Sequence, residues 1–291
     1  MIYTNATIRC NAIKCLLKDG YSSMNILFWN LHKKNLNGVI AALIKERDVD
    51  IALFAESENA DIAELAMRLE GYKLAALPGK DVIRAIYRKS TTTVIGRICV
   101  QSRMLLFKVV CGEPYLIVGL HLASMTDGLQ RRLEQIRIIN GFISEEERGR
   151  QYSNRTIVIG DFNANPFDIE MIGHNNFNAV LHADLIQRQE TVTWVNAEYK
   201  RFYNPILHFL TEDTKMYGSF YKHNDGRPLY WYCLDQVLIR KPLIKTLKNM
   251  EYVKTIGGSS LLKRSGLPDE RFSDHLPLLV EFAGGGEKAK D

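Results

Sequence analysis

Short apolar runs recur along the chain and alternate with segments of helical period. Val, Ile, Leu and aromatic residues dominate the short runs, which predicts buried strands. The predicted strands cover residues 25–30, 50–55, 82–87, 93–100, 105–110, 115–120, 156–159, 191–195, 233–239 and 276–282. Apolar residues spaced three and four apart predict amphipathic helices at 39–47, 62–69 and 129–143. Many strands with few helices predict two packed sheets flanked by helices.

The stretch 196–230 breaks this alternation. It carries eight aromatic residues among Lys, Arg, Asn and Pro: Tyr199, Phe202, Tyr203, Phe209, Tyr217, Phe220, Tyr221 and Tyr230. A loop of this length is usually functional or disordered, and so many aromatic residues argue against disorder. Two alternatives stay open, a structured insertion packed on a sheet and a flap that faces the substrate.

The ends of the chain differ from its middle. Residues 1–23 show no strong period, and the first convincing strand follows Met24. The glycine-rich and charged segment 284–291 has linker composition. We therefore expect one folded domain over 24–283, an N-terminal extension over 1–23 that need not be ordered, and a flexible tail over 284–291. A chain of 291 residues can form such a unit in large β-rich folds.

Composition narrows the class of protein. Charged residues make up 24% and hydrophobic residues 46%, which is typical of a soluble globular protein. The formal charge of +5 permits a polyanionic partner without requiring one. The five cysteines are scattered and favour reduced thiols. Because no apolar run approaches the roughly 20 residues that cross a bilayer, we expect no membrane insertion and a cytoplasmic location, and no obligate protein partner is evident.

Polar residues of a few types recur where the predicted strands end or begin. They are Asn30, Glu56, His121, Asp161, Asn163, Asp235, Asp274 and His275. Any one of them alone is more often a turn residue, a helix cap or a core histidine. Residues beyond strand tips lie where open sheets place their ligand sites. The recurrence of Asp, Glu, Asn and His at these tips therefore predicts one shared site.

The residue types match one chemistry. Carboxylates such as Glu56 hold Mg²⁺ or Mn²⁺, which keep open positions for phosphate and water. Asn and His donate hydrogen bonds to phosphoryl oxygens as charge develops on them. An adjacent Asp can orient a His and keep it protonated. The absence of thiolates from the set argues against zinc.

The ordered motifs resemble those of the endonuclease/exonuclease/phosphatase superfamily, which includes DNase I, over about residues 24–283. They are Trp29-Asn30, the run 50–56 ending in Glu56, His121-Leu122, Gly160-Asp161-Phe162-Asn163, 234–237 and Ser273-Asp274-His275. Each motif alone is weak, whereas Gly-Asp-Phe-Asn followed by Ser-Asp-His is specific for the superfamily. The resemblance implies a four-layered α/β sandwich, with two packed, mostly antiparallel sheets flanked by helices and a site where the sheets meet at one edge.

By this resemblance, Glu56 is the principal metal ligand, helped by Asn30 and Asp274, and the ion is Mg²⁺ or Mn²⁺. Glu58 is an alternative ligand that the strand register disfavours. The resemblance also gives Asn30 a part in binding the substrate, together with His121.

The same resemblance assigns the remaining roles. Asp161 orients or deprotonates the attacking water, and Asn163 holds the phosphate. Asp235 and His275 form an Asp–His pair that supplies either the base or a stabilising charge. We favour Asp161 as the base, because a protonated His275 paired with Asp235 is a poor base. His121 matches a second histidine of DNase I-like and phosphatase-like members.

Three positions depart from the patterns of individual branches. Ala55 stands where many members carry Gln, so one hydrogen bond near the metal is missing. His121 stands where abasic-site endonucleases usually carry Tyr. Gln236 follows Asp235 where inositol 5-phosphatases carry Arg. The last two departures argue against those two branches.

We therefore expect a divalent-metal-dependent phosphoester hydrolase, foremost a nuclease that cleaves phosphodiester bonds by in-line water attack. The alternatives are a phosphatase or phosphodiesterase for a small molecule or lipid headgroup, and a non-catalytic binding module. The basic balance and the arginines at 131–132 and 148–155 fit nucleic acid as the phosphoester partner. A solvated helix face explains the same arginines more simply.

Overall fold

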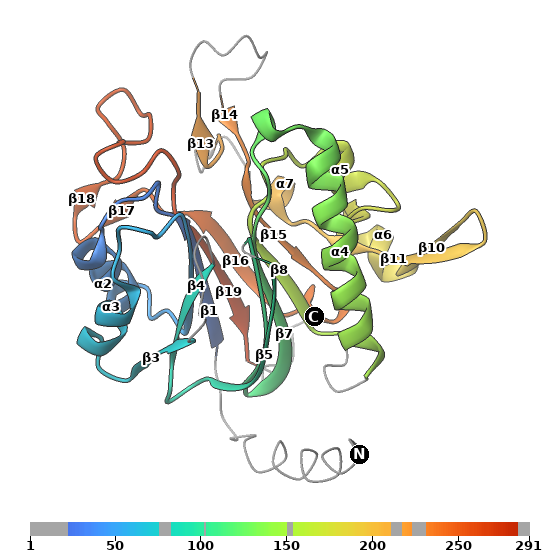
Figure 1. Cartoon of the computed structure of the whole chain (residues 1–291), viewed down its shortest axis with the longest axis horizontal. Coiled ribbons are helices and arrows are strands. Elements are labelled where there is room, and N and C mark those ends of the chain that lie inside the picture. The colour runs from blue at the N-terminus through green and yellow to red at the C-terminus, as the bar shows by residue number, and fades with distance from the viewer. Residues whose placement is uncertain are drawn as a thin grey trace.

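Two large sheets form the centre of the molecule (Figure 1). The computed structural model describes residues 23–75, 83–101, 103–149, 154–210, 217–222 and 231–284. The first sheet consists of β1 (Ser23–Asn30), β2 (Ile51–Ala55), β3 (Tyr72–Ala75), β4 (Arg84–Arg88), β16 (Leu247–Tyr252) and β19 (Leu278–Ala283). Their order is β16-β19-β1-β2-β4-β3. β1 and β2 are parallel, and the other neighbours are antiparallel.

The second sheet has seven strands. They are β5 (Thr93–Gln101), β6 (Met104–Cys111), β7 (Glu113–His121), β8 (Thr156–Asp161), β9 (Ala179–Val180), β12 (Phe202–Tyr203) and β15 (Asp235–Ile239). Their order is β5-β6-β7-β8-β15-β12-β9. β8 runs parallel to β7 and β12 parallel to β9, while the remaining pairs are antiparallel. Two mostly antiparallel sheets are therefore confirmed.

Helices cover the outer faces of both sheets. α2 (Asn37–Glu46) and α3 (Ile62–Arg68) lie outside the first sheet, and α4 (Leu129–Arg148) lies outside the second (Figure 1). The shorter helices are α5 (Ile169–Ile172), α6 (Ala183–Arg188) and α7 (Ile206–Phe209), with 3₁₀ turns η1 (Met125–Asp127) and η2 (Lys241–Leu243). The order helix, sheet, sheet, helix is the four-layered sandwich that the motifs indicated.

The period of two along β8 shows why its run is apolar without a break. Ile157 and Ile159 face the core between the sheets, whereas Val158 packs under α4 with Ile136 and Ile139. Both faces of this strand are covered, so every position is buried. The same burial on two faces holds the polar residues at its end in a rigid frame.

Some elements are absent from the predicted set or differ from it. β3 and β16 are edge strands of the first sheet. In β16, buried Met250 and Tyr252 alternate with more exposed polar residues, so the strand lacks a continuous apolar run. The predicted strand at 191–195 is β10 (Thr191–Trp194), which pairs with β11 (Ala197–Lys200) in a hairpin apart from both large sheets. Two further hairpins are β13 (Phe220–Tyr221) with β14 (Trp231–Tyr232), and β17 (Thr255–Ile256) with β18 (Ser259–Ser260).

The described parts of the aromatic stretch lie in two places. Phe202 and Tyr203 are buried in β12 and belong to the second sheet. Phe220 instead lies against the predicted site residue His275. Residues 211–216 and 223–230 of this stretch lie outside the described residues, as do 1–22 of the predicted extension and 285–291 of the predicted tail. In the parts of the chain that are described, the helices are too short or too polar to cross a membrane.

Candidate active site

The ends of six strands bring the predicted site residues to one edge of the sandwich. In the second sheet, Asp161 at the end of β8 pairs in register with His121 of β7 on one side and with Asp235 of β15 on the other. In the first sheet, Asn30 at the end of β1 pairs with Ala55 of β2, directly before Glu56. His275 precedes β19, the strand on the other side of β1.

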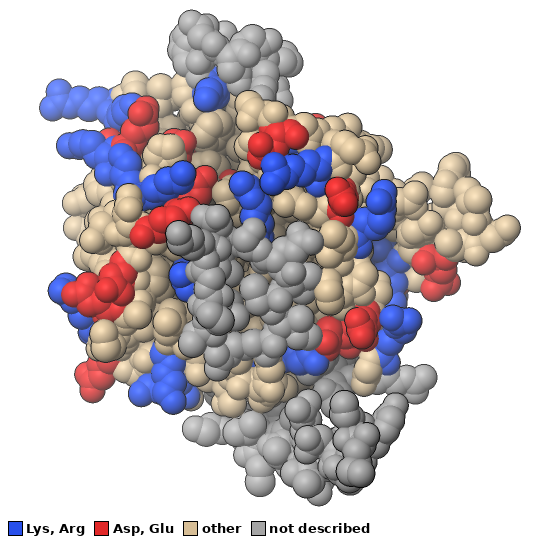
Figure 2. All heavy atoms as spheres, in the orientation of Figure 1, with Lys and Arg blue, Asp and Glu red and all other residues tan. Residues whose placement is uncertain are grey.

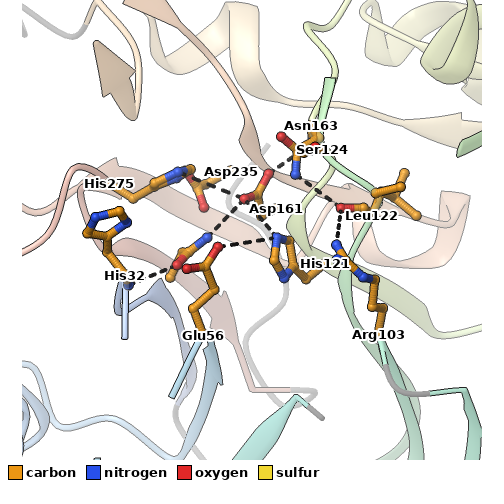
Figure 3. Close-up of polar contacts among 12 residues, drawn as sticks. His32, Glu56, Arg103, His121, Leu122, Ser124, Asp161, Asn163, Asp235 and His275 are labelled. Atoms are coloured by element: carbon orange, nitrogen blue, oxygen red, sulfur yellow. Dashed lines mark hydrogen bonds and ion pairs between the residues drawn. The ribbon is translucent and has the colours of Figure 1, made fainter. Parts of the chain in front are cut away.

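Asp161 is the hub of the cluster (Figure 3). Its Oδ2 accepts a hydrogen bond from Nδ2 of Asn30 at 3.1 Å. The Nε2 atoms of His121 and His275 lie 3.7 and 3.9 Å from the same oxygen. The carboxylate is 1% exposed. A buried carboxylate is thus surrounded by groups that can donate hydrogen bonds to it or to a small ligand beside it.

The turn after β8 shapes the hub. A Cβ atom at Gly160 would overlap the backbone carbonyl of Leu120 on the neighbouring strand, so glycine is required there. Asn163 has a φ of +47°, so the backbone is not extended there. Asp161 and Asn163 converge through the turn instead, because the backbone N–H of Asn163 donates to Oδ1 of Asp161 at 2.9 Å. Nδ2 of Asn163 donates to the carbonyl of Leu122 at 3.1 Å.

Asp235 and His275 form the predicted pair. Nδ1 of His275 lies 2.7 Å from Oδ2 of Asp235, and both residues are buried. Burial alone would lower the pKa of His275, but the charge and hydrogen bond of Asp235 outweigh it and raise that pKa to about 10. For the Asp235 carboxyl, burial acts in the opposite direction and raises the pKa. The imidazole therefore stays protonated at neutral pH, which suits a stabilising charge better than a base.

Three contacts hold His275 in place. Nε1 of Trp29 donates to the His275 carbonyl at 2.9 Å, and the His275 backbone N–H donates to Oγ of Ser273 at 3.1 Å. Oγ of Ser273 in turn donates to the carbonyl of Asn30 at 2.7 Å, which ties this loop to β1. The ring of Phe220 lies 4.8 Å from the imidazole. Trp29 and Ser273 were part of the motifs, but their anchoring roles depend on contacts that the sequence does not reveal.

Glu56 and His121 border an open cavity of about 660 Å³. Oε1 of Glu56 lies 3.7 Å from Nε2 of His121, and both side chains are partly exposed. Glu56 has a φ of +45°, a strained backbone of the kind that clusters at functional sites. Glu58 lines the same cavity and is more exposed than Glu56.

Asp274 lies beside the cluster rather than in it. Its Oδ1 is 3.3 Å from Nδ1 of His32, a residue that no motif marked. His32 also donates its backbone N–H to Oδ1 of Asn30 at 3.0 Å. Both side chains line a second cavity of about 400 Å³ together with Phe220, Tyr221 and Lys222. Seven of the eight site residues predicted from the sequence therefore lie in one network, and Asp274 lies at its border.

Among the described residues, Asp161, Asp235 and His275 form a group of possible metal ligands whose ligand atoms lie within 4.8 Å of one another. This trio is a poor cation site. Nδ1 of His275 is engaged by Asp235 at 2.7 Å, so a metal at this nitrogen would have to replace that hydrogen bond. The partly exposed Glu56 carboxylate, with the amide oxygen of Asn30 nearby, offers the oxygen donors that hard cations prefer.

Several arginines of the basic clusters serve the fold. Nε of Arg132 lies 2.7 Å from Oε1 of Glu170, and its Nη1 donates to the Ser124 carbonyl at 2.9 Å, with the residue 8% exposed. Arg155 pairs with Glu113 at 3.5 Å. Figure 2 shows basic and acidic side chains interspersed over the described residues of one face. Neither residue belongs to a solvated helix face, because Arg132 is buried against Glu170 and Arg155 lies beyond the end of α4.

Comparison with solved structures supports the fold indicated by the motifs. No protein-family model and no curated protein matches the chain. An endonuclease/exonuclease/phosphatase family protein of Bacteroides thetaiotaomicron superposes with a TM-score of 0.61 at 16% identity, covering 91% of this chain and 99% of the other. A mannosyl-6-phosphatase of the same organism gives 0.60 at 15% identity, covering 88% and 98%. TDP2 of D. rerio, complexed with a single-strand DNA product, gives 0.53 at 17% identity, covering 90% and 99%. At these identities the likeness establishes the endonuclease/exonuclease/phosphatase fold.

Proposed function

We propose that the protein is a divalent-metal-dependent phosphoester hydrolase, and foremost a nuclease that cleaves phosphodiester bonds. The observation that carries this proposal is the position of Asp161. Its buried carboxylate lies within reach of Asn30, His121 and His275, from three other strand ends. Such a set can hold a water molecule and a phosphoryl group side by side.

In this proposal Glu56 is the principal ligand of Mg²⁺ or Mn²⁺, with Asn30 and Asp274 contributing oxygens. The ion, when bound, would supply positive charge to the phosphoryl oxygens. Oδ1 of Asn30 already accepts the His32 backbone N–H, and its second lone pair is available. Asp274 belongs to this set only if its carboxylate turns away from His32.

The protein's own groups divide the remaining work. Asp161 accepts the proton of the attacking water. Asn163 donates from Nδ2 to a phosphoryl oxygen, since an amide nitrogen carries two hydrogens and the Leu122 carbonyl takes one. The protonated His275, held by Asp235, stabilises the negative charge that develops in the transition state. His121 donates to the same phosphoryl group.

The hollows beside the site favour a diester over a monoester. One cavity opens beside Glu56 and His121, and the other beside Asp274 and Phe220. A phosphodiester carries a group on each side of the reacting phosphorus and can use both hollows. The solved neighbours include a protein bound to single-strand DNA and a mannosyl-6-phosphatase. A phosphatase for a small molecule or lipid headgroup is therefore the second candidate.

The test compares bis(4-nitrophenyl) phosphate, a diester, with 4-nitrophenyl phosphate, a monoester, in Mg²⁺, in Mn²⁺ and in EDTA. We expect metal-dependent cleavage with preference for the diester, and loss of it in Asp161→Ala. Preference for the monoester would favour the phosphatase. Absence of cleavage of either ester, and of DNA, RNA and phosphoinositides, would leave a non-catalytic binding module.

A further inference from the structure

Arg103 lies at the rim of the site but belongs to none of the motifs. It stands between the end of β5 at Gln101 and the start of β6 at Met104, in the turn that joins them. Its backbone carbonyl accepts the N–H of His121 at 2.9 Å. The turn is therefore tied directly to the strand end that carries a predicted substrate-binding residue.

The Arg103 guanidinium is held by a neutral partner. Nη1 donates to the carbonyl of Leu122 at 3.2 Å, and the same carbonyl accepts Nδ2 of Asn163 at 3.1 Å (Figure 3). Among the described residues, no carboxylate forms an ion pair with Arg103. The side chain lines the cavity that Glu56 and His121 border. The charge of Arg103 contributes to the lowered pKa of Asp127 without forming an ion pair with it. A positioned, half-buried cation with no direct ion pair among the described residues is suited to an anionic ligand.

We propose that Arg103 binds a second phosphate of the substrate, next to the reacting phosphoryl group in a phosphodiester chain. This inference rests on the proposed function. In Figure 3, Arg103 and Leu122 lie on the side of His121 away from His275, so the guanidinium is not directed at the Asp161 hub. One N–H is used by the Leu122 carbonyl, and the remaining donors of the planar fork match phosphate geometry. The substrate is then a polynucleotide strand rather than an isolated phosphate ester.

The mixed charges that line the cavity leave Arg103 as a single phosphate contact rather than part of a basic groove. Lys33 and Arg84 also line the cavity, but so do the acids Glu58 and Asp61. The cavity is therefore not a continuous basic groove. A single charge-assisted contact should neutralise one phosphate and account for one phosphate's share of the salt dependence of binding.

The kinetic test compares the full-length protein with Arg103→Gln on two substrates, a short oligothymidylate and bis(4-nitrophenyl) phosphate. The control, Arg188→Gln, removes the same charge from an exposed position on α6. We expect Arg103→Gln to raise KM for the oligonucleotide about tenfold or more, the size of a lost hydrogen bond to a charged group. Its kcat/KM on the single-phosphate diester should stay within about twofold of wild type. Arg103→Lys should recover part of the loss.

The binding test needs no turnover. Fluorescence anisotropy with the labelled oligothymidylate in EDTA should show weaker binding by Arg103→Gln, with the slope of log K against log salt smaller by about 0.7. Arg188→Gln should match wild type.

The outcomes separate the inference from the proposed function. Equal losses on both substrates, an unchanged KM, or no binding of the strand by wild type would overturn the role of Arg103. An inositol bisphosphate could displace the oligonucleotide from wild type but not from Arg103→Gln. That result would assign the Arg103 contact to a small polyphosphate and would overturn the proposal that the substrate is a polynucleotide strand. If wild type cleaves neither substrate, the proposed function fails, and the binding comparison still decides whether Arg103 contacts a phosphate.

Discussion

Asn30 donates a hydrogen bond from Nδ2 to Oδ2 of Asp161 at 3.1 Å, and this bond joins the two sheets at the edge where the site lies. Asn30 ends β1 of the first sheet, and Asp161 ends β8 of the second. The orientation of the hub carboxylate therefore depends on how the two sheets pack. We expect Asn30→Ala to lower kcat about 10- to 100-fold by freeing Asp161.

The measurement is steady-state turnover of a phosphodiester at saturating metal. Asn25→Ala serves as the control, because Asn25 lies at the other end of β1 and binds the backbone carbonyls of Arg47 and Asp48. That variant should lose stability and keep its turnover per folded molecule. Normal kcat in folded Asn30→Ala would contradict the claim that Asn30 orients the Asp161 carboxylate for turnover.

The pH dependence of turnover should report the Asp235–His275 pair. Asp235 holds the pKa of His275 at about 10, so the imidazole loses its proton only as the pH rises through that value. Wild-type kcat should therefore stay flat to about pH 9. In Asp235→Asn the charge that raises this pKa is gone, so the alkaline decline should begin at lower pH. A rate profile from pH 6 to about 11 covers the alkaline decline of both proteins. An unchanged profile in Asp235→Asn would exclude the charged imidazole from the reaction.

The metal requirement distinguishes Glu56 from Glu58. Loss of a carboxylate ligand should raise the half-saturating Mg²⁺ concentration of Glu56→Gln at least about tenfold. Glu58→Gln removes the same charge from the same cavity and should leave that concentration near the wild-type value. A titration of activity against Mg²⁺ gives both numbers. The opposite order would make Glu58 the ligand.

The glycine before the hub should tolerate no side chain. Gly160→Ala places a Cβ against the backbone of Leu120, which cannot move away as a flexible side chain can. We expect a loss of about 2 kcal/mol in the free energy of unfolding, with lower turnover because Asp161 shifts. Gly141→Ala is the matched control, since its Cβ would meet nothing within 4 Å on an exposed helix position. That change should stabilise α4 by about 1 kcal/mol. Thermal melting and turnover of both variants test the contrast.

A buried ion pair supports the sandwich away from the site. Nε of Arg240 lies 2.8 Å from Oε1 of Glu147, which also accepts the hydroxyl of Thr156 at 2.7 Å. Burial alone would raise the pKa of Glu147, but Arg240 and these hydrogen bonds outweigh it and lower the pKa. Removing one partner leaves the other charge buried, so Glu147→Gln should cost about 3–5 kcal/mol.

The lowered pKa sets the direction of the pH effect. The stabilisation by Glu147 is present above the carboxyl's ordinary pKa and is lost as the pH falls through the lower value of the folded state. The stability gap between wild type and Glu147→Gln should therefore narrow in acid. Denaturant unfolding at several pH values measures it. The exposed pair of Arg68 and Glu64 is the comparison, since Glu64→Gln should cost less than about 1 kcal/mol at any pH.

The sequence by itself determined the type of most elements and the order of the motifs. A strand buried on both faces, such as β8, has a continuous apolar run, and a helix with one buried face, such as α4, has apolar residues with a period near 3.6. These patterns are visible in the sequence because the burial of each position determines whether its residue is apolar or polar. Edge strands such as β16 have one wetter face and leave a weaker record. The resemblance of the motifs supplied seven residues that the fold brings into one network.

Only the tertiary structure decided which groups touch. Asn30 and Asp161 are 131 residues apart, and Trp29 is 246 residues from the His275 carbonyl that it holds. No local pattern encodes contacts over such separations, because they depend on the packing of two sheets. The same packing turned Asp274 toward His32, buried Arg132 against Glu170, and left Arg103 at the cavity without a direct ion pair among the described residues. Two residues of the same type, such as Arg132 and Arg103, thus have different roles because their spatial neighbours differ.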